Sequence, residues 1–161
     1  MAMPSVYENT GQSNGTGAIS IAWGTHATNF VAICRIQTSN QVITGVSAGW
    51  TEIVSDGVGT AGSAGAVRTT AYWKRAASGS EAAFTADDPG DHWVGDMLML
   101  QNVVTSGNPI NTSGSFTIGT PQTAVTVALG STTNNNCLVF TVVGGAIDTV
   151  DFSGSSNITN A

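Results

Sequence analysis

The chain has 161 residues, of which only 9% are charged, and its formal net charge is −6. Its four cations are too few to neutralise the phosphates of a nucleic acid or to hold the protein on an anionic membrane, and no stretch approaches the roughly 18 consecutive apolar residues of a membrane-spanning helix. A chain of this length can bury a core without disulfides or metals and no linker divides it, so we expect residues 1–161 to form a single domain.

The N-terminal segment, residues 1–15, reads MAMPSVYENTGQSNG and contains neither a basic region nor an apolar run. It therefore lacks the features of a signal peptide. We expect an extended arm at this position. We also expect the protein to stay in the cell that makes it, or to leave by another route such as lysis.

From residue 18 onward, short apolar or alternating runs are separated by Gly, Asn, Asp, Ser and Pro. Helix-forming residues are scarce, whereas Gly, Thr, Ser, Val and Asn are abundant. This spacing predicts an antiparallel β-sandwich of about ten short strands, jelly-roll-like or immunoglobulin-like, with essentially no helix. The expected strands are residues 18–23, 29–37, 41–46, 50–54, 67–76, 81–87, 92–104, 115–119, 123–129, 137–143 and 146–152.

The stretch RTTAYWKRAASGSEAAFTADD, residues 68–88, holds three of the four cations. We interpret it as a β-hairpin with its turn at residues 78–80, in which Lys74 and Arg75 flank the turn and Glu81 lies close enough across it for a surface ion pair. Tyr72 and Trp73 are consecutive in the first strand, so their side chains point to opposite faces of the sheet. One ring is therefore expected inside and the other outside.

Two further local features concern the expected strands. Cys34 and Cys137 lie in apolar runs, so we expect two buried free thiols, with a disulfide between neighbouring strands as the alternative. The Gly95-Asp96 step interrupts an otherwise apolar strand, which is typical of a β-bulge. Lys residues commonly prevent an exposed strand edge from pairing with another chain, and this chain has almost none. We therefore expect loops or another subunit to cover the strand edges. We also expect the chain to self-associate.

No arrangement of residues predicts catalysis or a cofactor. Paired carboxylates, a nucleophile elbow and a phosphate-binding loop are all missing, so we expect a protein that is not an enzyme. Asp87, Asp88 and Asp91 are weak candidates for a calcium site, but DPGD is first of all an ordinary turn. Trp50 and Trp93 are expected to fill the core. Exposed aromatic rings stack on sugars or anchor interfaces, so the candidate binding residues are Trp23, Tyr72 and Trp73.

Several short motifs follow one another in a distinctive order. They are Gly49 to Ile53, Tyr72 to Ala76, Gly79 to Glu81, Phe84-Thr85, Asn102-Val103, Asn108-Pro109, Thr123 to Leu129 and Asn136 to Phe140. This order, over residues 15–155, resembles a β-sandwich domain family of bacteriophage virion proteins that includes decoration and tail-fibre-associated modules. In that family further strands usually follow the last motif, and a sandwich without them leaves an edge that a partner's strand can fill.

The resemblance implies a structural protein of the virion that is made in the cytoplasm of the host bacterium. Its partners would be other capsid or tail proteins. Capsid decoration is the favoured role within this class. The alternatives are a tail-fibre or tail-spike module that binds the host, and a lectin-like domain that binds a surface glycan.

Overall fold

The computed structural model describes residues 3–115 and 137–138. Within them the chain forms eight strands and no helix: β1 (Ser5–Asn9), β2 (Ser13–Gly15), β3 (Ile19–Ile21), β4 (Val31–Thr38), β5 (Thr51–Val58), β6 (Val67–Arg75), β7 (Phe84–Ala86) and β8 (Trp93–Gln101). No helix in this part of the chain could span a membrane. The strands expected at 123–129 and 146–152, and most of those at 115–119 and 137–143, lie outside the described residues.

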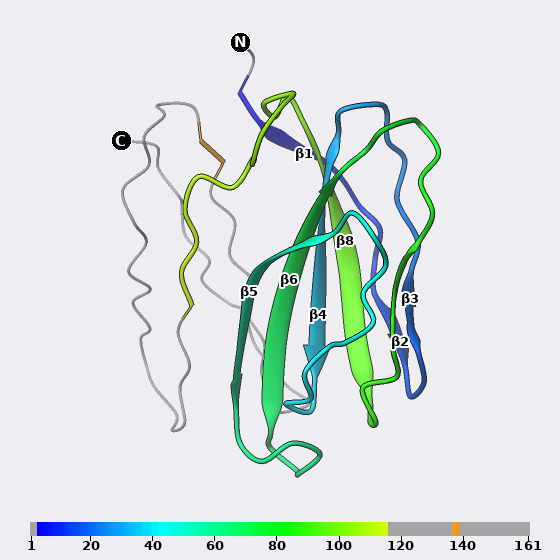
Figure 1. Cartoon of the computed structure of the whole chain (residues 1–161), viewed down its shortest axis with the longest axis vertical. Coiled ribbons are helices and arrows are strands. Elements are labelled where there is room, and N and C mark those ends of the chain that lie inside the picture. Colours follow the sequence, from blue (N-terminus) through cyan, green and yellow to red (C-terminus); the bar gives the residue numbers. More distant parts are fainter. Residues whose placement is uncertain (1–2, 116–136, 139–161) are drawn as a thin grey trace.

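The strands form two antiparallel sheets, which confirms the expected all-β sandwich (Figure 1). The larger sheet has six strands in the order β1-β8-β4-β6-β5, with β2 also paired to β8. The smaller sheet pairs β3 with β7. The count is eight strands rather than about ten, because one expected strand is a loop, several fall outside the described residues, and the N-terminal segment adds two.

The N-terminal segment, expected to be an extended arm, is part of the larger sheet. β1 pairs with β8 from Ser5 opposite Gln101 onward, and β2 continues along the same strand, with Ser13 opposite Gly95. β8 is buried over most of its length, so its free backbone groups need partners, and the N-terminal residues supply them.

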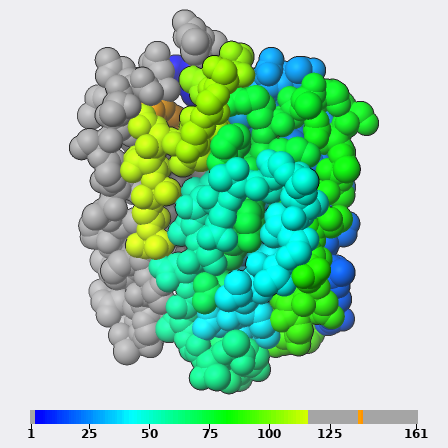
Figure 2. Space-filling view, viewed as in Figure 1, coloured from blue at the N-terminus to red at the C-terminus, as the bar shows by residue number. Residues whose placement is uncertain are grey.

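The segment at residues 41–46 is a loop, so the strand expected there is wrong. Gly45 has a φ of 62°, which an extended strand does not allow. The segment still lies beside β7, because Asp87 N donates to Thr44 O at 2.9 Å and Ser47 N donates to Thr85 O at 2.8 Å. The loop at residues 41–49, coloured cyan, covers the front of the larger sheet in Figure 2.

Both faces of the larger sheet carry apolar clusters. This explains why β4 reads as a continuous apolar run, since Val31, Ala32, Ile33 and Cys34 are all buried. The inner cluster lies between the sheets and includes Ile19, Ile21, Ala32, Cys34, Ile36, Ile43, Tyr72, Phe84, Ala86, Trp93, Met97 and Met99. The outer cluster is formed by Val31, Ile33, Leu98 and Leu100, with Ile53, Trp73, Val103, Ile110 and Leu138 packed against it.

Residues 68–88 do not form a hairpin. β6 pairs with β4 and β5, whereas β7 pairs with β3, so this stretch crosses from one sheet to the other. The expected ion pair is nevertheless present, with Lys74 Nζ 2.9 Å from Glu81 Oε2. Glu81 also accepts hydrogen bonds from the backbone of Ala77 and Ser78 and thereby fixes the crossing.

The bulge expected at Gly95-Asp96 is also absent, because β8 pairs with β4 in unbroken register from Trp93 to Leu100. Bulges lie instead in the two edge strands of the described sheet. The register of β1 shifts between Val6 and Glu8, and that of β5 shifts between Glu52 and Val54. A bulge twists an edge strand away from pairing, which protects both edges without Lys.

Candidate functional site

The three candidate binding aromatics are not brought together. Trp23 and Tyr72 belong to a row of rings on the inner side of the larger sheet, whereas Trp73 packs against the outer cluster. The row runs from Trp23 to Trp50 at 5.6 Å, then to Phe84 at 5.1 Å and to Tyr72 at 5.4 Å between ring centroids. This row fills the space between the sheets and is not a stacking platform for a ligand.

Tyr72 is the inner member of the Tyr72-Trp73 pair, and its side chain is only 4% exposed. Burial, followed by the nearby charge of Glu52 and a hydrogen bond to it, raises the pKa of Tyr72 to about 12. Trp73 is half-buried on the outer face. Neither ring is the exposed residue that the sequence led us to look for.

The raised pKa of Tyr72 predicts a loss of stability at alkaline pH. The unfolded tyrosine loses its proton near pH 10 and the folded one near pH 12, so stability is fully present below pH 10 and falls as the pH rises through 12. Glu52→Gln removes one of the causes and should lower the pKa of Tyr72. The measurement is a tyrosinate absorbance titration, and Tyr72→Phe identifies the signal of this residue. An unchanged titration in Glu52→Gln would contradict the assignment.

All four cations contact other groups of this chain, including the three that lie between Arg68 and Arg75. Lys74 pairs with Glu81 and also lies 5.7 Å from the centroid of the Trp23 ring. The remaining contacts are Arg35 to both carboxylate oxygens of Asp96, Arg68 Nη1 to Ser55 Oγ at 3.1 Å, and Arg75 to the carbonyls of Val104 and Gly107. The cations therefore hold loops and strands in place.

The three aspartates considered as calcium ligands point to different partners. Asp87 accepts from Thr44 Oγ1 at 3.0 Å, Asp88 accepts from Gly90 N at 2.7 Å, and Asp91 contacts His92 Nδ1 at 2.7 Å. Gly90 has a φ of 88°, as the turn interpretation requires. The described residues contain no group of three or more potential metal ligands.

Neither cysteine forms a disulfide, so the disulfide alternative is wrong, and of the two thiols expected to be buried only Cys34 is. Cys34 is buried between the sheets, and burial raises the pKa of its thiol. Cys137 is half-buried and lies 3.7 Å from Asn111 Nδ2.

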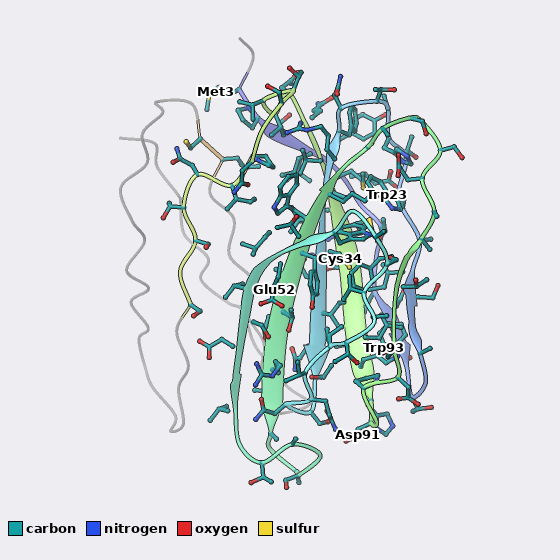
Figure 3. All side chains as sticks on the ribbon, in the orientation of Figure 1. Met3, Trp23, Cys34, Glu52, Asp91 and Trp93 are labelled. Carbon is teal, nitrogen blue, oxygen red and sulfur yellow. The ribbon has the colours of Figure 1, made fainter. Side chains whose placement is uncertain are left out.

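An open cavity of about 500 Å³ lies at the end of the sandwich where β4 ends and β6 and β8 begin. We call it the end pocket. In Figure 3 its residues Asp91 and Trp93 lie at the opposite end of the molecule from Met3. Its lining consists of Asn14, Gly15, Thr16, Gln37, Thr38, Ser39, Gly62, Ser63, Ala64, Gly65, Ala66, Asp91, His92, Trp93 and Val94.

The titratable groups of the end pocket are Asp91 and His92. Hydrogen bonds from the side chain and backbone of His92 and from Ser39 hold the pKa of Asp91 below its usual range. Because Ser39 donates to Asp91 and not to His92, these residues are not in the Ser-His-Asp order in which an imidazole activates a hydroxyl. The group is therefore suited to binding through a fixed carboxylate.

The end pocket was missed by reasoning from the sequence. The glycine-rich loop around residues 57–65 and the DPGDH turn each signal only a loop. The sequence does not show the order of the strands in the sheet. Because β4 lies between β6 and β8 and is antiparallel to both, the end of β4 meets the starts of the other two. Knowledge of the strand order would have brought these loops together.

Comparison of the chain with family models, curated proteins and solved structures found no match in any of the three. The resemblance to phage virion domains thus depends on the order of the short motifs alone. Function has to be argued from the fold and from the surface of the described residues.

Proposed function

We propose that this chain is a non-enzymatic structural protein of a bacteriophage virion, and within that class a capsid decoration protein. The order of motifs in the sequence supports the class. The observation that supports attachment to another protein is an apolar patch at the N-terminal edge of the larger sheet. This patch, which we call the β1 patch, consists of Met3, Val6 and Tyr7, and each side chain is about half exposed.

The β1 patch is suited to side-chain contact more than to strand pairing. The bulge in β1 disrupts the regular edge that a neighbouring strand would need. Tyr7 packs edge-to-face on Phe30, with ring centroids 5.2 Å apart, so the ring is already ordered before a partner arrives. Ordered aromatic side chains are the commonest anchors of protein interfaces.

Charge does not oppose contact at the β1 patch. Glu8 is the only charged residue of β1, and its carboxylate accepts a hydrogen bond from Thr25 N at 2.5 Å. The other described edge is less available, because Ser113 Oγ reaches Ile53 O at the bulge of β5. The β1 patch is therefore the surface that we assign to the capsid contact.

The test uses co-sedimentation of the purified chain with heads of the phage that encodes it. We expect the wild-type chain to bind heads, and Val6→Ser to weaken binding by about tenfold or more because Val6 is part of the β1 patch. Val42→Ser is the matched control, because Val42 lies in the loop at residues 41–49 and is 62% exposed, whereas Val6 lies in β1 and is 47% exposed. It should bind like the wild type.

Two results would overturn the proposal. One is a chain that does not sediment with heads at any concentration. The other is adsorption of the isolated chain to host cells in place of heads, which would make it a tail-fibre module that binds the host.

A further inference from the structure

The end pocket is built from four separate segments of the chain. These are residues 14–16 at β2, residues 37–39 at the end of β4, residues 62–66 before β6, and residues 91–94 at the start of β8. Its volume of about 500 Å³ falls within the range of roughly 300–1,000 Å³ that is typical of small-molecule sites. Several loops at the end of one sheet thus line one open cavity, which is how binding sites are commonly formed.

The floor of the end pocket is held rigidly. Trp93 is buried, and its Nε1 donates to Gly17 O at 2.9 Å. A Cβ on Gly15 would lie 3.1 Å from the indole ring, so a larger residue there would push the ring away by a few tenths of an ångström. The part of the lining at residues 62–66 consists of small residues, Gly62 to Ala66.

The carboxylate of Asp91 is fixed at this cavity by His92 Nδ1 and Ser39, yet its side chain remains 30% exposed. A carboxylate held in this way can accept two hydrogen bonds from neighbouring hydroxyl groups of a ligand. Asn14, Thr16 and Ser63 add amide and hydroxyl groups, which both donate and accept.

The charges of the end pocket disfavour anionic ligands. Its lining contains no Lys or Arg, and all four cations of the chain bind other groups of the protein. A ligand carboxylate or phosphate would therefore meet the charge of Asp91, whose own partner in the lining is His92, with no Lys or Arg to compensate. Uncharged hydroxyl groups fit this set of partners, and anionic groups do not.

We propose that the end pocket is a binding site for a neutral saccharide. Sugar hydroxyls bind the carboxylate of Asp91 and the polar side chains of Asn14, Thr16 and Ser63. The lack of cations in the lining makes the site selective against acidic sugars. The site lies at the other end of the molecule from the β1 patch, so both surfaces can be occupied at once (Figure 3).

The test follows amide chemical shifts of the isotope-labelled full chain during addition of glucose, galactose, mannose, N-acetylglucosamine and glucuronic acid at millimolar concentrations. At least one neutral sugar should shift residues that line the end pocket, whereas glucuronic acid should bind at least about tenfold more weakly. Asp91→Ala and Asn14→Ala should each weaken binding of that neutral sugar, Asp91→Ala by about tenfold or more.

Asp88→Ala is the matched control, because it removes a carboxylate from the same turn but outside the lining. It should leave sugar binding unchanged. The proposal fails if none of the neutral sugars shifts the pocket residues, if glucuronic acid binds as well as its neutral counterpart, or if Asp91→Ala binds like the wild type. Co-sedimentation of Asp91→Ala with heads separates this result from the capsid proposal, because that contact uses the β1 patch and should be unaffected.

Discussion

Phe84→Ala should lower the free energy of unfolding by about 3–5 kcal/mol. Phe84 is the largest fully buried side chain among the described residues, with 0% exposure, and its ring packs against those of Trp50 and Tyr72. Removing it leaves a cavity between the two sheets that the short β7 strand cannot close without losing its pairing with β3. Because the free energy of unfolding of a whole domain is only about 5–15 kcal/mol, this one change should remove a large part of the stability of the folded state.

Urea unfolding followed by tryptophan fluorescence measures this loss. Phe30→Ala is the matched control, because it deletes the same atoms from a half-buried position. We expect a clearly smaller loss for Phe30→Ala. Equal losses in the free energy of unfolding at the two positions would contradict the larger stabilisation that we expect from the row of rings between the sheets.

Gly95→Ala should lower the free energy of unfolding by about 2–3 kcal/mol, as overpacking in a core does. A Cβ on Gly95 would lie 2.7 Å from the carbonyl oxygen of Arg35 and 2.7 Å from Ile21 Cδ1. The first contact is backbone, so β8 would have to move away from β4, whereas the second is the end of the Ile21 side chain, which would have to shift within the core. Gly95 does not have a positive φ, so the expected loss comes from contact and not from backbone strain.

Gly17→Ala is the control for this prediction, since Gly17 has no positive φ and nothing within 4 Å of the added Cβ. It should change the free energy of unfolding by less than about 0.5 kcal/mol. Thermal unfolding by circular dichroism can compare the two variants. A Gly95→Ala protein as stable as Gly17→Ala would contradict the close packing of the two sheets at this point.

The strand positions could be predicted because they depend on local sequence. Apolar and β-branched residues at 29–37, 67–76 and 92–104 predicted three strands, and β4, β6 and β8 occupy them within a few residues. The loop at residues 41–46 was mistaken for a strand because its apolar residues alternate in the same way. Only the conformation of Gly45 and the backbone bonds to β7 distinguish it.

The pairing of strands could not be predicted from neighbouring residues. After β6 the chain remains bonded to the segment that leads into β4, since Ala76 N donates to Phe30 O at 2.8 Å and Asn29 N donates to Ala76 O at 2.9 Å. These bonds carry the chain past the point where a hairpin would turn back, so that β7 joins β3. Contacts between residues far apart in sequence therefore override the local turn signal.

The sequence by itself determined the all-β class and the antiparallel sandwich, because both follow from local pattern and composition, whereas it left open the state of the two thiols and which cation pairs with Glu81. The tertiary structure alone decided that Tyr72 faces inward, that the cations are internal partners, and that the loops at 62–66 and 91–94 line one open cavity. These features depend on which strands become neighbours and on which faces are covered. Both are set by packing between distant segments, and no short stretch of residues contains that information.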